Sequence, residues 1–442
     1  MIDQQLSLKP KRTLRTRLWR AGGLVGIFVL TFFIGNFFIP RDKAVTRQML
    51  GHDFLAFYYA GTCARTGQLD KLYDLDATRQ FEARTGAAAG LELGPGFGPW
   101  WNPPFAAWMF APLSALPYHT ALVIWWSIGF TCLGIAIALM CRMLGGGWKT
   151  WLLVPLLIVT VMPFFQVFSH GQNTYVSLML LCIAVTLWRA GWSLAAGLVC
   201  GLMFYKPQLG AVIAIVLCLS QGRRAILGVA LTATALLLVN VLSMPGTIHE
   251  FLFHMPQNLH WMQEENHYRW ERHVTFKGFW RLTFQGWASG PTAPIVYVLW
   301  GICELALLAG MAAVSWRTLR GPRDASSTDR LIAAAITAMP LLMPFYFDYD
   351  LLLISVAVVL YAVDYQRQSV HFAEDRWLIR TWICLFVVLE FGTMLAGHTR
   401  VHPVVPLVSV AAALLIRRTL RPRAARALAQ TPPEMLVTAA AA

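Results

Sequence analysis

The chain has 442 residues, of which 57% are hydrophobic and 13% are charged. A soluble globular domain carries about 25% charged residues, so this composition excludes an ordinary soluble protein and indicates a membrane protein with several spans. The formal net charge of +14 does not indicate nucleic-acid binding, because lysine and arginine punctuate the apolar runs instead of forming one stripe.

The N-terminus joins a basic segment, KPKRTLRTRLWR, to an apolar run over residues 21–39. This run is longer than the h-region of a cleaved signal peptide, which has about 7 to 15 residues. The run ends in NFFIPRDK. We therefore expect a signal anchor, with residues 1–20 as a basic cytoplasmic tail.

An acidic residue, Asp53, follows in the stretch GHDFLAFYYAG, just after this first apolar run. A charge so close to hydrocarbon is costly and needs a partner, a water-filled cavity or a function. One explanation is structural: aspartate is a preferred N-cap, and a helix can begin with FLAFYYA. The other explanation is a role in catalysis or binding at the membrane surface.

The segment 102–117, NPPFAAWMFAPLSALP, is apolar but too short to cross a bilayer, which takes about 20 residues. Prolines bound it, and proline is tolerated in the first turn of a helix. We expect a re-entrant or interfacial helix on the outer side of the membrane.

Beyond this segment, lysine and arginine fall on alternate turns between the apolar runs. The basic turns lie at residues 142–149, 188–192, 221–224, 316–323, 364–368 and 417–423. The intervening turns lie at residues 169–173, 205–208, about 244–291, 345–350 and 397–403. By the positive-inside rule, this alternation predicts an all-α membrane protein with about twelve spans, two long extracytoplasmic loops and both termini in the cytoplasm.

Several of these predicted spans are short. Residues 193–219 contain two of them if the chain turns back near Pro207, and one kinked helix if it does not. The single helix would place the basic turn QGRR on the outside, so we favour the hairpin. Spans shorter than about 20 residues predict a cavity that reaches into the membrane from the outer face.

Under this topology, eight polar residues from distant parts of the chain lie at the same outer face. They are Asp53, Asn102, His170, Gln172, Asn173, Lys206, Asp348 and Asp350. This convergence predicts a functional site.

Structural explanations stay open for individual members of this set. Lys206 can extend its ammonium group to the membrane interface, as long basic side chains near helix ends do. Gln172 and Asn173 can cap the next span, and Asp348 and Asp350 can mark a turn.

Histidine and cysteine spacing gives no indication of a metal site. The five histidines of the long loop, His249, His254, His260, His267 and His273, lack standard metal-ligand spacing, and no CxxC occurs. We therefore expect neither a metal nor a cofactor.

The ordered motifs between about residues 50 and 365 resemble glycosyltransferase family 87, the DUF2029 membrane proteins with a GT-C fold. The motifs are GHDFLAFYYAGTCARTGQLDKLYD, NPPFAAWMFAPLSALP, GQNTYVSLMLL, AAGLVCGLMFYKPQLG and PFYFDYDLLLI. The chain departs from the family in WNPP, where many relatives have YPP, and in FDYDL, where some relatives carry histidines. Asp348 and Asp350 therefore inherit no histidine role.

The resemblance, which extends to mycobacterial α-mannosyltransferases, implies a bacterial plasma-membrane enzyme. Such an enzyme transfers a hexose, with mannose favoured, from a polyprenyl-phosphate carrier to a hydroxyl of a glycolipid or glycan acceptor at the extracytoplasmic face. By similarity, Asp53 is the general base and the sugar is transferred with inversion.

The remaining polar residues suit supporting roles in such a reaction. Lys206, Gln172 and Asn173 suit the carrier phosphate, which gains charge as its bond to the sugar breaks. The expected substrate cavity contains His170, Asn102, Tyr58, Tyr59, Trp101, Asp348 and Asp350. A retaining mechanism would use a second carboxylate as nucleophile, and either Asp348 or Asp350 can serve.

A transporter or lipid-linked sugar flippase is the main alternative, because short or broken spans with polar groups at membrane depth are typical of transporters too. We see no internal repeat, which weakens that alternative. An inactive partner in an envelope pathway is a third possibility. The expected domains are the tail 1–20, a transmembrane glycosyltransferase domain at 21–417, and a disordered cytoplasmic tail at 418–442 that touches anionic lipid.

Overall fold

The computed structural model describes residues 51–421, except 92, 94–95, 267, 322–323 and 369–370, together with Gly23 and Ile27. The predicted tail 1–20, nearly all of the predicted signal anchor and the end of the predicted C-terminal tail therefore lie outside the described residues.

The described residues form an all-helical protein, as predicted, and their only β-type contact is a single bridge between His273 and Phe347. The first helices are α2 (Phe54–Thr66), η1 (Leu69–Lys71), α3 (Leu75–Ala88), η2 (Pro104–Met109) and η3 (Leu113–Ala115), where η marks a 3-10 helix. Then follow α4 (Tyr118–Met143), α5 (Trp148–Val159), α6 (Met162–His170), α7 (Thr174–Arg189), α8 (Ser193–Leu202), η4 (Met203–Tyr205), α9 (Pro207–Gln221) and α10 (Arg223–Ser243). The remaining elements are α11 (Thr247–Glu264), η5 (Trp270–Arg272), α12 (Phe276–Gln285), α13 (Pro294–Arg320), α14 (Ala325–Leu342), η6 (Asp348–Leu353), α15 (Ile354–Arg367), α16 (Ala373–Leu389), α17 (Gly392–Thr399) and α18 (Val404–Thr419).

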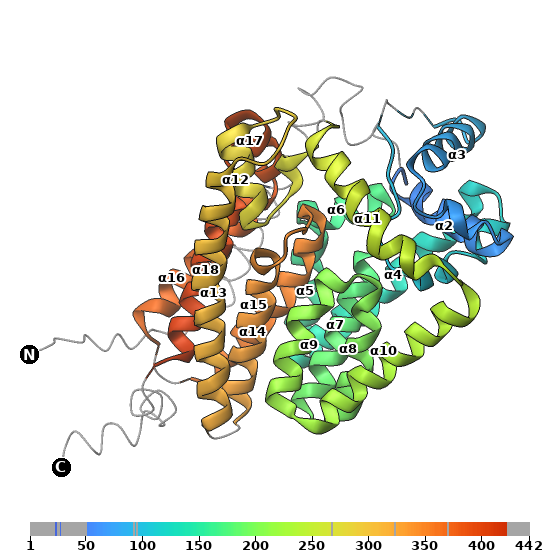
Figure 1. Cartoon of the computed structure of the whole chain (residues 1–442). Helices are drawn as coiled ribbons and strands as arrows, with labels where there is room; N and C mark the ends of the chain where they lie inside the picture. The colour runs from blue at the N-terminus through green and yellow to red at the C-terminus, as the bar shows by residue number, and fades with distance from the viewer. Residues whose placement is uncertain are drawn as a thin grey trace, which may run out of the picture.

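An amino-terminal unit of α2, α3 and η1 to η3 lies at one corner of the molecule, away from α16 and α18 (Figure 1). Gly61 lets α2 approach the segment after η2 closely, since a Cβ there would lie 2.5 Å from the carbonyl carbon of Phe110. The predicted interfacial helix at 102–117 consists of the two short 3-10 helices η2 and η3. Its prolines explain this, because they remove the backbone donors that a longer α-helix needs.

Three helices in the described part of the chain are long and apolar enough to cross a membrane: α4, α10 and α13. The number rises to five if the pairs α5–α6, bent by 63°, and α16–α17, bent by 75°, each form one span. These helices support a membrane protein, while the prediction of about twelve spans stays a prediction.

The segment 193–219 forms the predicted hairpin. Gly197 and Gly201 of α8 lie against Ala225 and Thr232 of α10 in the same order along both helices, so α8 and α10 are parallel. The helix between them, α9, must therefore run in the opposite direction. A 2.8 Å hydrogen bond from Ser193, which begins α8, to Gln221, which ends α9, joins the two open ends.

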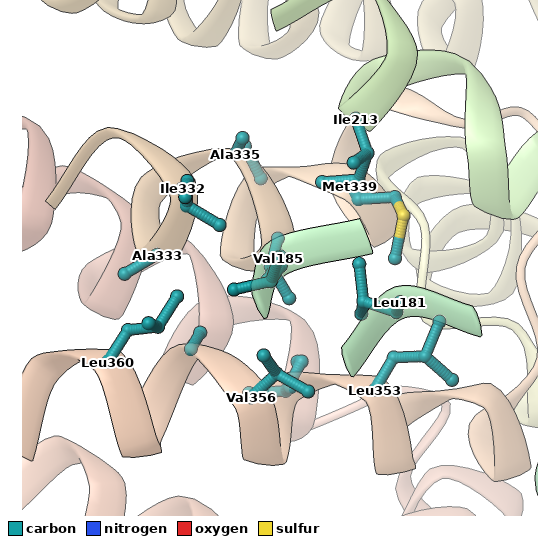
Figure 2. Packing of buried hydrophobic residues seen from close by; sticks show 14 of the residues in the cluster. Leu181, Val185, Ile213, Ile332, Ala333, Ala335, Met339, Leu353, Val356 and Leu360 are labelled. Atoms are coloured by element: carbon teal, nitrogen blue, oxygen red, sulfur yellow. The ribbon is translucent and has the colours of Figure 1, made fainter. Parts of the chain in front are cut away.

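Helix α14 is the centre of the core. Nearly all of its side chains are buried, which is typical of a helix surrounded by other helices. Figure 2 shows Ile332, Ala333, Ala335 and Met339 of α14 among apolar side chains of α7, α9, η6 and α15. This packing fixes η6, and with it the turn at 345–350 that runs into η6, relative to α7 and α9.

The basic turns gather at one end of the helices, which we call the basic end. Asp329 pairs with Arg189 at 2.7 Å and with Arg367 at 2.8 Å. Asp364 pairs with Arg330 at 3.1 Å and with Arg418 at 3.0 Å. These contacts join three turns that the charge alternation predicts on one side of the membrane. Arg418 is itself buried, so the folded chain extends past the predicted domain end at residue 417.

We predict that Gly228→Ala destabilises the fold. A Cβ at Gly228 on α10 would lie 2.3 Å from the carbonyl oxygen of Leu194 on α8, so the two helices must separate. Overpacking of this kind costs about 1–3 kcal/mol. The measurement is the apparent melting temperature of the purified protein in detergent.

The matched control is Gly134→Ala on α4, where a Cβ meets nothing within 4 Å. Equal melting temperatures for the two variants would contradict the close approach of α8 and α10.

Candidate active site

A cavity of about 540 Å³ lies at the end of the helices opposite the basic end. Helix α14 begins at the basic end with Asp329 and Arg330 and leads to the turn at 345–350, which forms part of the cavity wall. The other walls come from the start of α2, the segment 96–102, the break before α9 and the loop after α11. Its polar and charged lining residues are Asp53, Asn102, Gln172, Lys206, Gln208, Asn266, Tyr268, Arg269, Arg272, Tyr349 and Asp350.

Asp53 lines this cavity just before α2, and its carboxylate is engaged by side chains from distant segments. Gln172 donates a 2.6 Å hydrogen bond to Oδ2, and Nε2 of His52 lies 3.1 Å from Oδ1. Nδ1 of His170 lies 3.5 Å from Oδ2. Asp53 makes no side-chain capping bond to α2, so capping does not explain its presence.

Asp53 is held in its ionised form. Burial alone would raise its pKa, but the hydrogen bond with His52 and the charge of Arg272 outweigh burial and hold the pKa of this carboxyl below its usual range. An ionised carboxylate only accepts hydrogen bonds, so Asp53 can take a proton from a substrate hydroxyl.

Arg272 lines the cavity and connects Asp53 to a second carboxylate. Its guanidinium binds Asp348 through Nη2 at 3.1 Å and Nε at 3.4 Å, and Nη2 lies 3.2 Å from Nδ1 of His170. Asp348 itself lies behind the wall, where Gln166 and Thr393 each donate to it at 2.8 Å. His170 is buried beside the cavity.

Lys206 and Asp350 form a buried ion pair in the cavity wall. Nζ of Lys206 lies 3.1 Å from Oδ1 and 3.2 Å from Oδ2 of Asp350, and Thr174 donates to Oδ1 at 2.6 Å. The two residues are 5% and 2% exposed. Lys206 therefore has a partner already, which its predicted phosphate role did not include.

The aromatic walls come from two of the sequence motifs. Trp101 and Asn102 of the WNPP motif both line the cavity, and their contact with a substrate stays a prediction. Phe345, Phe347 and Tyr349 alternate along the turn at 345–350 and line the cavity too. Flat apolar faces beside polar groups suit a sugar ring.

The structure does not bring Tyr58, Tyr59 or Asn173 to the cavity. The hydroxyl of Tyr58 donates to the carbonyl of Leu116, and that of Tyr59 donates to the carbonyl of Lys71. Both tyrosines lie more than one turn beyond Asp53 on α2 and pack into the amino-terminal unit. Asn173 is buried at the start of α7, and its side chain makes no hydrogen bond within the described residues.

Sequence reasoning missed His52 and Arg272. His52 directly precedes Asp53, and that adjacency is the signal that was present. Arg272 ends the short 3-10 helix η5 between α11 and α12, in the segment that the sequence predicted as one long loop, so its position depends on tertiary packing. Arg269 at the cavity rim was missed for the same reason.

One group of metal-ligating side chains occurs in the described part of the chain: His52, Asp53 and His170 offer ligand atoms that all lie within 4.8 Å of one another. The histidines of the predicted long loop, which were not expected to bind a metal, do not belong to this group. His249, His254 and His260 are exposed on α11, His273 is buried, and His267 lies outside the described residues.

Glu82 on α3 supports the segment that closes one side of the cavity. Its Oε2 accepts a 3.0 Å hydrogen bond from the backbone N–H of Gly98, which lines the cavity. Glu82 is 3% exposed, and burial raises the pKa of its carboxyl to about 8.

Comparison with known proteins gives one match. The model of a protein family described as Glycosyltransferase family 87 matches residues 100–344, which is more than half of the chain. No curated protein and no solved structure matches the sequence.

We predict that Glu82 makes stability depend on pH. Its pKa is about 8 in the folded state and near 4.5 when exposed, so the folded state holds the extra proton between these values. Its contribution to stability is therefore complete below pH 4.5 and is lost as the pH rises through 8. Between pH 5 and pH 9, the apparent melting temperature should fall by several degrees more in the wild type than in Glu82→Gln.

Glu265→Gln, at an exposed glutamate, serves as the control and should behave as the wild type. A wild type and Glu82→Gln variant with parallel pH profiles would show that Glu82 is not held neutral by burial.

Proposed function

Since the chain belongs to glycosyltransferase family 87, we propose that it transfers a hexose, with mannose favoured, from a polyprenyl-phosphate carrier to an acceptor hydroxyl. The observation that supports this best is the position of the Asp53 carboxylate in the wall of a cavity of about 540 Å³ that Arg272 and Lys206 also line. The proposed acceptor is a glycolipid or glycan.

In the proposed reaction, the acceptor oxygen attacks the anomeric carbon of the carrier-linked sugar. The new bond forms between these two atoms while the bond from the anomeric carbon to the phosphate oxygen breaks. The electron pair of that bond goes to the phosphate, and the hydroxyl proton goes to Asp53. General-base assistance of this kind contributes about 10² to 10⁴-fold.

Arg272 and Lys206 are the proposed cations for the leaving phosphate. Arg272 uses Nε and Nη2 for Asp348 and His170, and no hydrogen bond within the described chain engages its Nη1. Lys206 is paired with Asp350, so its ammonium group would contact the phosphate and Asp350 at the same time. Fixed cations in a cavity that excludes bulk water stabilise developing charge strongly.

The contacts of the carboxylates in the site favour a single displacement, in which the sugar is transferred with inversion. A retaining enzyme needs a second carboxylate free to attack the sugar. Asp350 is bound by Lys206 and Thr174, and Asp348 lies behind the wall, bound by Arg272. Neither is a free nucleophile, which supports a single displacement with Asp53 as the proposed base.

We place the cavity at the extracytoplasmic face of a bacterial plasma membrane and both termini in the cytoplasm. The basic end supports this orientation, because arginine-rich turns favour the cytoplasmic side. A GT-C arrangement with about twelve spans belongs to the same proposal. Helix breaks at α5–α6 and α16–α17 also occur in transporters, but membership of a glycosyltransferase family favours transfer over transport.

We predict that Asp53→Asn abolishes transfer while the protein still folds. Asparagine keeps the shape of the side chain but cannot accept the proton, so transfer should fall by about 100-fold or more. The measurement uses the full chain in nanodiscs, radiolabelled polyprenyl-phosphate-mannose and a membrane lipid extract as acceptor. Melting temperatures establish that wild type and variant are equally folded.

Asp76→Asn, at an exposed aspartate on α3, is the matched control and should transfer at the wild-type rate. Equal transfer by wild type and Asp53→Asn would remove Asp53 from the role of base. Transfer from another lipid-linked hexose would correct the sugar, and transfer from none of a panel of them would overturn the proposal.

We predict that Lys206→Met destabilises the protein by about 3–5 kcal/mol, because Asp350 then remains buried without its partner. The double variant Lys206→Met/Asp350→Asn removes both charges and should recover most of this stability. Thermal unfolding measures the stability, and the mannose assay measures transfer by the double variant.

If Lys206 assists the phosphate, the double variant stays at least tenfold below wild type in transfer despite its recovered stability. Full recovery of transfer would show instead that Lys206 serves only the ion pair.

A further inference from the structure

The side chains of His52, Asp53 and His170 meet beside the cavity as a set of metal-ligating groups. Two imidazoles and one carboxylate each offer one ligand atom, and these atoms lie within 4.8 Å of one another. The three residues come from the loop before α2 and from the end of α6. Gln172 donates to the same carboxylate and keeps it oriented.

Their spacing suits a single ion. Nitrogen and oxygen ligands lie about 2.0 to 2.2 Å from a tetrahedral zinc ion, which places neighbouring ligand atoms about 3.3 to 3.6 Å apart. Nε2 of His52 lies 3.1 Å from Oδ1 of Asp53, and Nδ1 of His170 lies 3.5 Å from Oδ2. The three ligand atoms lie within 4.8 Å of one another, so the side chains must draw together to complete this part of a coordination shell.

The contact between Arg272 and His170 identifies which ring nitrogen carries a lone pair. A guanidinium has no acceptor, so the 3.2 Å contact requires Nδ1 of His170 to accept. This imidazole is therefore neutral, as a metal ligand must be. Nδ1 of His170 and Oδ2 of Asp53 then face each other as two acceptors with no proton between them, an arrangement that a cation stabilises.

The charges around the cavity also favour a bound cation. Three cations line it: Lys206, Arg269 and Arg272. Four carboxylates lie in or directly behind its walls: Asp53, Asp348, Asp350 and Glu271. With neutral histidines the sum is three minus four, or −1, before a phosphate-bearing substrate adds further negative charge. A divalent cation makes this sum positive.

We propose that His52, Asp53 and His170 bind one divalent transition-metal ion at the wall of the cavity. Two imidazole ligands favour zinc, or cobalt in its place, over magnesium, calcium and manganese, which prefer oxygen ligands. Binding through Nδ1 of His170 would require Arg272 to give up its 3.2 Å contact with that nitrogen, while its contact with Asp348 could remain. This replaces the expectation from the sequence that no metal binds.

The ion's role in the reaction rests on the proposed function, but its binding does not. An ion held by these residues would supply a Lewis acid for an oxygen of the substrate phosphate or of the acceptor hydroxyl. An aspartate can bind an ion through one oxygen and keep the other for a proton, so Asp53 can serve both roles.

The experiment measures metal binding directly, without any sugar donor. Chelator-treated full-length protein in nanodiscs is titrated with Zn²⁺ or Co²⁺ alone, and binding is followed by calorimetry and by the visible absorption of Co²⁺. The expected result is one ion per chain. His52→Gln and His170→Asn should each weaken binding roughly tenfold or more, because each removes one of three ligands.

His52 is partly exposed, so His52→Gln should fold even if His170→Asn does not. The matched control is His260→Gln, at an exposed histidine 3.7 Å from Glu264, and it should bind as the wild type. An absence of binding to the wild type, or equal binding by wild type and His52→Gln, would overturn the proposal. Because transfer is measured separately, sugar transfer by a chain that binds no metal would overturn this inference alone.

Discussion

The buried carboxylate of Asp348 holds together the segments that form the cavity end of the molecule. It accepts hydrogen bonds from Gln166 on α6, Thr393 on α17 and Arg272 at the end of η5. An uncompensated charge at this depth would be strongly destabilising, so these donors are a condition of the local fold. Since α6 and α17 are the second halves of the two bent pairs, one charged group fixes both bends.

The bends and the cavity depend on each other. Backbone groups freed by a helix break at membrane depth must be buried in protein or face water, because lipid offers them no hydrogen bonds. The break between α8 and α9, where Lys206 lies, follows the same rule: the ammonium group pairs with Asp350 inside the protein, in the wall of the cavity. Arg272 contacts both Asp348 and His170. The position of Asp348 therefore helps to determine the position of His170 beside Asp53.

The parts of the site that the sequence predicted depend on topology, and the parts that it missed depend on packing. Lys206 and Asp350 are 144 residues apart, yet the alternation of basic turns places them at one face. The same alternation predicted the hairpin of α8 and α9. Tyr58 and Tyr59 could not be placed, because the face that α2 turns toward the cavity is decided by its packing against η2 and η3.

The cations of the cavity are all paired with carboxylates, and this limits how an anion can enter. Arg269 has Glu271, Arg272 has Asp348, and Lys206 has Asp350. A phosphate must therefore share these cations with groups that already hold them, which weakens the attraction of each one. A further source of positive charge would strengthen anion binding at such a site, and the proposed ion at His52, Asp53 and His170 would supply one.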